Sequence, residues 1–254
     1  MKQFPMSATQ NIKTIAKREL GEYFSSPLAY VVIVIFLLLI GFFTFSRAGG
    51  FFERGQASLD LPFFVWHPWL YLFLVPAVGM RLWAEERRVG TLELLLTMPI
   101  TAWQAIVGKF LASWIFLAVA LFLTFPVVIT VNYLGSPDNG VILCAYIGSW
   151  LMGGAYLAIS CITSAITRNQ VISFILSFMV CLLLVLCGWP PVTEFLTRWD
   201  APWLVNVVSS LSVMSHFEWF MKGVLDSRDI IYFLSIIGFS LFTTGVILRS
   251  HRAG

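Results

Sequence analysis

The chain has 254 residues, of which 59% are hydrophobic and only 11% are charged, and its mean hydropathy is +0.86. A soluble domain is about half apolar and a quarter charged, so this composition predicts an integral membrane protein. The formal net charge of +3 is small and comes from scattered residues, which excludes the concentrated basic surface that is typical of nucleic-acid-binding proteins.

Six apolar segments come close to the 20 or so residues that a helix needs to cross a bilayer. Such runs are too long for the strands of a membrane barrel. We therefore predict an all-α fold, a single polytopic domain over residues 1–254 with six transmembrane helices. Pro76 and Pro126 lie within spans and are expected to kink them. The spans cover about residues 28–45, 66–82, 110–133, 141–166, 171–189 and 230–248.

The segment before the first span, residues 11–24, has the pattern of an amphipathic helix. Its apolar residues lie near one face, and Lys13 and Lys17 lie on another. This pattern predicts an interfacial helix that lies flat on the membrane until Ser26 and Pro27 turn the chain into the first span. The alternative is a plain solvated N-terminus. The first apolar run begins only at Leu28 and lacks a small-residue cleavage site behind it, so we expect no signal peptide.

The connection between spans two and three carries a dense group of charges, followed by an apolar stretch that ends at Pro99. A charged start, a break and cap, and an acid in the first turn are typical of a short helix, since the helix dipole favours an acid there. We predict a cytoplasmic helix on which another protein acts; the alternative is an ordinary charged loop. The predicted residues are Glu85, Glu86, Arg87, Arg88, Gly90, Thr91, Glu93 and Leu94.

The connection between spans five and six, residues 190–229, is long, rich in aromatic residues and too polar to span. We predict one or two short helices at the outer interface, or a re-entrant pair, which survives at membrane depth only where protein or water covers the backbone. His216 and Glu218, on either side of Phe217, suggest a metal or proton site. Residues two apart on a helix do not share a face, so we favour an interfacial histidine and predict no metal site.

Two further patterns concern the inside of the bundle. Gly153 and Gly154 in the fourth span would allow a close approach between helices, although glycines that merely face lipid are an equal alternative. The four cysteines all lie in apolar runs without a metal-ligand spacing, which predicts buried, inert thiols.

The basic residues predict the orientation. Eleven of the sixteen Lys and Arg residues fall on the side that holds both termini, and five fall on the other. The richer side is the cytoplasm by the positive-inside rule. Both termini are therefore predicted to be cytoplasmic, which an even number of spans also requires.

Missing motifs limit the chemistry. The sequence has no GxxxxGK[ST] phosphate loop and no HExxH motif. Its spans hold almost no ionisable side chains, only His67 and Arg81 at the ends of the second, which argues against an ion-driven carrier and an intramembrane protease. We therefore expect the chain to be no enzyme, to bind no cofactor and to receive its energy from outside the bilayer.

Three stretches resemble one family. The run from Pro76 to Pro99, PAVGMRLWAEERRVGTLELLLTMP, resembles the hallmark stretch of type-2 ABC permeases. The opening stretch, with Arg18, Glu19 and Tyr23 before SSP, and the late stretch SHFE followed by KGVLDSRDIIY are similar to the same class. Together they look most like the gliding-motility permease branch, with the nitrous-oxide-reductase maturation permeases as near relatives.

The resemblance implies a permease of the bacterial inner membrane that exports across it, powered by ATP hydrolysis in a separate subunit. The implied complex holds two copies of an ABC ATP-binding subunit, which carry the ATP and Mg, and a second permease copy or a paralogue. The charged connection after span two is then the coupling helix, and residues 11–24 the connecting helix. The alternative function is a mechanical transmitter that transports nothing and acts on an extracytoplasmic accessory protein. Membrane lipid is an expected partner in either case.

Overall fold

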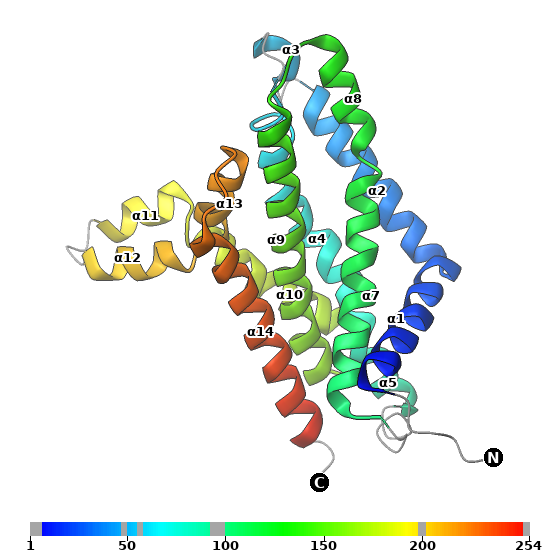
Figure 1. The fold of residues 1–254 in the computed structure, drawn as a ribbon. Coiled ribbons are helices and arrows are strands. Elements are labelled where there is room, and N and C mark those ends of the chain that lie inside the picture. Colours follow the sequence, from blue (N-terminus) through cyan, green and yellow to red (C-terminus); the bar gives the residue numbers. More distant parts are fainter. Residues whose placement is uncertain (1–6, 47–49, 55–57, 92–99, 198–201, 251–254) are drawn as a thin grey trace.

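The computed structural model describes residues 7–46, 50–54, 58–91, 100–197 and 202–250, and within these ranges all regular secondary structure is helical. The helices form an elongated bundle (Figure 1). One end carries α3 (Phe51–Arg54) and the other carries α5 (Arg81–Val89); we call them the α3 end and the α5 end.

Four helical stretches are long and apolar enough to cross a membrane, and a fifth, α10 (Gln170–Leu186), is apolar but shorter. These five follow the predicted spans one, three, four, five and six, which confirms a multi-helix membrane protein. The full count of six spans stays a prediction. The four long stretches are α2 (Pro27–Phe45), α7 (Ala102–Phe122) continued by α8 (Phe125–Leu134), α9 (Asn139–Ile166) and α14 (Ser227–Ser250).

The second predicted span, residues 66–82, is not one continuous helix. The chain instead forms η1 (Phe64–Trp66), α4 (His67–Gly79) and α5, with a turn at Met80. Helix α4 approaches α9 closely just before this turn, since a Cβ atom at Gly79 would lie 2.3 Å from the Cβ of Ser160. Pro76 lies within α4 as predicted.

Helix α9 is the centre of the bundle and contacts α4, α5, α7, α10, α13 (Val213–Met221) and α14. The glycine pair expected to permit close packing does so. A Cβ atom at Gly154 would lie 2.6 Å from Nε1 of Trp114, and one at Gly153 would lie 3.2 Å from Cε2 of Tyr71. These glycines therefore face protein rather than lipid.

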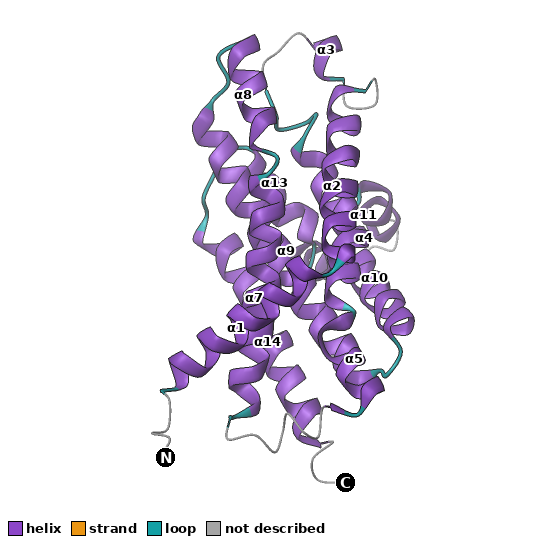
Figure 2. Ribbon diagram, turned by 90° about the vertical axis from the view of Figure 1, so that its right-hand side faces the viewer, coloured by secondary structure: helices purple, strands orange, loops and turns teal. Residues whose placement is uncertain are grey.

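The N-terminal helix is α1 (Ala8–Ser25), which confirms a helix over residues 11–24, while its place at the membrane interface stays a prediction. Ser26 is extended and Pro27 begins α2, so the predicted turn is confirmed. Helix α1 packs against α7 near the α5 end. The start of α1 and the end of α14 lie at the same end of the bundle (Figure 2), as an even number of crossings requires.

Residues 190–229 contain three short helices in place of the one or two expected: α11 (Pro190–Thr197), α12 (Pro202–Ser210) and α13. Helices α11 and α12 pair with each other and extend sideways from the bundle (Figure 1). Helix α13 returns to pack on α9 and α14, and Phe217 is fully buried there. Whether any of this segment enters the membrane stays a prediction.

Candidate functional site

Helix α5 is fixed at its start by a single hydroxyl group from α9. Ser164 Oγ accepts the backbone N–H groups of Trp83 and Ala84, each at 2.9 Å, and donates to the carbonyl oxygen of Met80 at 3.0 Å. One hydroxyl group thereby uses its donor and both lone pairs on backbone groups that a helix terminus leaves unpaired. Farther along, Arg87 donates to the carbonyl oxygen of Ala165. Helix α5 is thus bound to the end of α9.

A buried lysine joins three helices at the α5 end. Nζ of Lys109, on α7, lies 2.9 Å from Oε1 of Glu19 on α1 and 2.9 Å from Oε1 of Glu86 on α5. The lysine is only 4% exposed and also lies over the ring of Trp83. We call Glu19, Lys109 and Glu86 the charged junction. Buried charges need partners because desolvation is costly, and here each carboxylate has the same cation.

One oxygen of the Glu86 carboxylate has no hydrogen-bond donor in the part of the chain that the structure describes. Oε2 is buried and has no hydrogen-bond partner among the described residues. Burial raises the pKa of Glu86, while Lys109 lowers it. Lys109 therefore favours the charged form of this side chain, against the larger effect of burial.

Helix α1 adds a second layer to the junction. Arg18 donates to Oε1 of Glu19 at 2.8 Å, and this bond raises the pKa of the guanidinium. The Tyr23 hydroxyl lies 3.0 Å from Oγ of Ser113, which donates to the carbonyl of Lys109, and 3.4 Å from the carbonyl oxygen of Val78. Burial raises the pKa of Tyr23. The predicted residues of α1 therefore point toward α7 as well as toward the surface.

Other side chains of α5 are more exposed to solvent than Glu86 is. Glu85 is about two-fifths exposed and makes a 3.3 Å ion pair with Arg81 one turn earlier, while Arg88 is exposed. Gly90 ends the helix with φ of +80°, a left-handed conformation that favours glycine. A polar cavity of about 170 Å³, bounded by residues of α1, α5 and α7, lies next to the junction.

A family comparison identifies the chain. The family model described as ABC-2 family transporter protein matches residues 13–248. The chain belongs to the ABC-2 transporter family. It is a permease component of an ABC transporter, and such permeases work with an ABC ATP-binding subunit. No curated protein matches the chain. The narrower likeness to the gliding-motility branch stays a prediction.

The structure divides the predicted coupling residues of this permease. Arg88 and Thr91 are exposed and Glu85 is partly exposed, whereas Glu86 and Arg87 bind other helices of the same chain. Thr91 donates to the carbonyl oxygen of Glu86, and the segment that it was expected to cap lies outside the described residues, so its capping role stays a prediction. Glu93 and Leu94 lie outside the described residues.

Sequence reasoning missed the charged junction of the permease. Lys109 was counted as a cytoplasmic charge just outside the third span, but the helix begins at Ala102 and buries it. Its two partners are far away in sequence, so no local spacing points to them. The signal that could have raised suspicion is a lone lysine in a long apolar helix, since such residues face protein and find a partner.

The two outer residues considered for a metal or proton site do not meet. Nδ1 of His216 pairs with Oδ1 of Asp229 at 2.5 Å, and its ring stacks on Tyr232. Glu218 instead pairs with Lys222 at 3.1 Å on the surface. In the described part of the permease, no group of three His, Cys, Asp or Glu side chains is placed to hold a metal. All four cysteines are free, three of them buried and Cys187 half-buried.

Proposed function

We propose that the chain is the membrane-spanning subunit of an exporter of the inner membrane, in which ATP hydrolysis by two copies of a separate subunit moves the helices of two permease chains. ATP and Mg bind to the partner subunits. The exposed face of α5, with Glu85, Arg88 and Thr91, is the surface that meets the ATP-binding subunit. Both termini are on this cytoplasmic side.

The observation that supports this role is the charged junction. A helix that receives force must be joined to the helices that it moves. Lys109 ties α5 to α1 and α7, and Ser164 ties it to α9. Movement of α5 alone would break ion pairs in a buried site, where loss of a partner costs about 3–5 kcal/mol. A displacement of α5 is therefore passed to α1, α7 and α9 together.

Charge reversal of Glu85 tests the contact with the partner. The chain offers a control of the same chemistry, because Glu85 with Arg81 and Glu218 with Lys222 are both glutamate–cation pairs one helical turn apart, the first partly exposed and the second exposed. Leaving a hydrogen-bonded interface charge without its partner costs about 2–5 kcal/mol, or roughly 30-fold and more in affinity. Glu85→Lys should weaken capture of the ATP-binding subunit or uncouple its ATPase from transport, and Glu218→Lys should change neither.

The measurement is affinity capture of the ATP-binding subunit, together with ATPase rate and transport in vesicles. Both variants should give the same chromatographic profile as the parent, because each change is confined to the surface. Undiminished capture and coupled turnover in Glu85→Lys would mean that α5 is only a topological anchor.

A transmitter that moves no solute is the second candidate, favoured by the α11–α12 pair that extends beyond the bundle. Trp203 in this pair is exposed, as expected of a surface that meets another protein. Deleting residues 190–210 would separate the two functions. If the variant still transports solute but loses an extracytoplasmic partner, an exporter with an accessory protein is favoured. If the complex hydrolyses ATP but moves no solute in any assay, the transmitter is favoured.

A further inference from the structure

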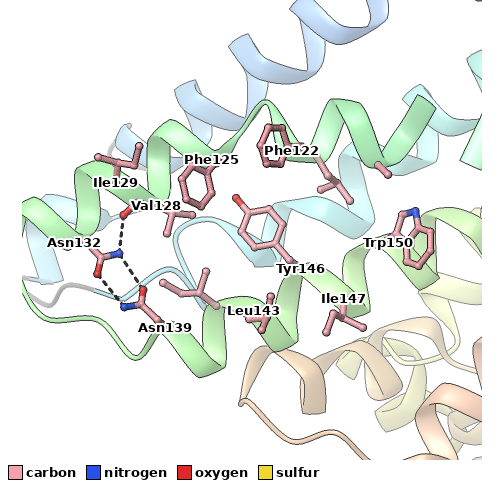
Figure 3. Close-up of a pocket in the computed structure, with 13 residues that line it drawn as sticks. Phe122, Phe125, Val128, Ile129, Asn132, Asn139, Leu143, Tyr146, Ile147 and Trp150 are labelled. Atoms are coloured by element: carbon pink, nitrogen blue, oxygen red, sulfur yellow. Dashed lines mark hydrogen bonds between the residues drawn. The ribbon is translucent and has the colours of Figure 1, made fainter. Parts of the chain in front are cut away.

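An apolar pocket opens on the side of the bundle near the α3 end, between α7–α8 and α9 (Figure 3). Its volume is about 830 Å³, within the range of roughly 300–1,000 Å³ that is typical of ligand sites. Aromatic and aliphatic side chains from both helices point into it. They include Phe122, Phe125, Ile129, Leu143, Tyr146 and Ile147.

A helix break creates the pocket. Helix α7 ends at Phe122 and α8 begins at Phe125, where Pro126 in the first turn has no N–H group to continue the α7 ladder. The Thr124 hydroxyl donates to the carbonyl oxygen of Leu121 at 2.6 Å and accepts from the Tyr146 hydroxyl at 2.7 Å. The break is thus hydrogen-bonded to Tyr146 on α9. Helix α8 leaves α7 at a new angle beside the pocket (Figure 1).

The pocket reaches from the hydrocarbon to the outer interface. A helix rises about 1.5 Å per residue, so the path from Lys109 to Asn132 is at most roughly 35 Å, and the break between α7 and α8 shortens it toward the roughly 30 Å of the hydrocarbon core. Lys109 belongs to the charged junction at the α5 end, which marks one face of the bilayer. Asn132 is therefore at the opposite face, with the rest of the pocket lying inward of it.

Two amide side chains lie at that outer rim, while the polar atoms of Tyr146 and Trp150 deeper in the pocket bond to Thr124 and to the carbonyl of Trp114. Nδ2 of Asn132 donates to Oδ1 of Asn139 at 3.0 Å, and Nδ2 of Asn139 donates back at 3.1 Å (Figure 3). Each primary amide has two N–H donors, so Asn139 keeps one N–H available. None of the described residues that line the pocket is charged. The pocket thus has a long apolar wall and a neutral hydrogen-bonding edge.

We propose that this pocket binds one acyl chain of a phospholipid from the surrounding bilayer, with the ester group next to the Asn132–Asn139 pair. The apolar wall complements the chain, and the amide edge complements the neutral ester carbonyls at the same depth. The inference concerns a bound lipid, and it holds whether or not the chain exports anything.

A second copy of the chain fits this pocket less well. Helices pair in membranes through small residues that let backbones approach. Large side chains surround the mouth of the pocket, and the glycines in the middle of α9 are already covered within the chain, with Gly148 against Phe220 and Gly154 against Trp114. A helix is about 10–12 Å wide with its side chains, whereas an acyl chain is narrow enough to enter between α8 and α9.

Photolabelling tests the proposal. The full chain is reconstituted into phosphatidylethanolamine–phosphatidylglycerol vesicles that contain a trace of phospholipid with a diazirine in one acyl chain, and adducts are located by peptide mass spectrometry. Adducts should concentrate in residues 118–150. Leu143→Trp, which fills the pocket, should reduce this labelling to the level of other lipid-facing helices. Leu183→Trp, an equally exposed leucine on α10, should leave it unchanged.

Ile129→Trp fills the same pocket from α8 and replaces Leu143→Trp if that variant does not fold. Labelling of residues 118–150 no stronger than that of α10, or labelling that survives both filling variants, would overturn the proposal. Disulfide-linked dimers of Ile147→Cys would also overturn it, because a second copy would then cover the pocket.

Discussion

Removing the cation of the charged junction should destabilise the permease far more than removing a surface lysine. Lys109→Met keeps the length of the side chain but leaves Glu19 and Glu86 buried without their shared partner. Loss of one member of a buried ion pair costs about 3–5 kcal/mol. For soluble chains near this size the unfolding midpoint falls by about 2–4 °C per kcal/mol, so we expect a midpoint roughly 10 °C lower.

Lys222→Met is a closely matched control. Lys222 also pairs with a glutamate, Glu218, and also lies over a tryptophan ring, but its side chain is more than half exposed. Exposed pairs are worth about 0–1 kcal/mol, so this variant should remain near the parent. The assay is thermal unfolding in detergent with a thiol-reactive dye, since Cys144, Cys161 and Cys181 are buried and free and react only when the bundle opens.

The pH dependence of the stability lost in Lys109→Met provides a second readout. Burial raises the pKa of Glu86, and Lys109 opposes that rise. An acid with a raised folded-state pKa stabilises the fold by protonation; this contribution is complete below the unfolded pKa and is lost as the pH rises through the folded one. Without Lys109 the pKa of Glu86 rises further, so the difference in stability between Lys109→Met and the parent should shrink as the pH falls. A deficit that matches Lys222→Met, or one that grows as the pH falls, would refute the reasoning.

Two other outcomes follow from packing and charge. Gly154→Ala should lower the free energy of unfolding by about 1–3 kcal/mol because its Cβ would meet Trp114. Gly41→Ala, with open space around it, should be neutral or slightly stabilising. Equal stability of the two variants in thermal unfolding would contradict the packing of α9. In a background without native cysteines, Ser136→Cys should react with an impermeant thiol reagent in intact cells and Thr101→Cys should not. Labelling of Thr101→Cys from outside would show that the orientation is wrong.

Much of the fold could be predicted because its signals are local. Long apolar runs identify helices by length and hydropathy alone, and the turn at Ser26 and Pro27 follows from the fixed backbone of proline. The break before Pro126 has the same cause. Each of these features depends on residues within a few positions of one another, so the sequence contains all the information needed.

The features that the sequence did not predict depend on which helices face each other. Residues 66–82 look like one span, but the hydroxyl of Ser164 on α9 binds the backbone of Met80, Trp83 and Ala84 and so favours a turn at Met80. His216 likewise pairs with Asp229 on the next helix rather than with a neighbour on its own. Apolar periodicity indicates that a helix has a buried face without indicating its partner.

The two adjacent glutamates of α5 show what this means for coupling. Successive residues on a helix point about 100° apart, so Glu85 faces solvent while Glu86 reaches Lys109. A substitution at Glu86 therefore changes the junction as well as any partner contact, and reversing both charges at once would confuse the two. Substituting Glu85 alone probes the contact with the ATP-binding subunit, and substituting Lys109 alone probes the link to α1 and α7. If α5 transmits force, loss of either should uncouple hydrolysis from movement, but only loss of Lys109 should also lower the stability of the bundle.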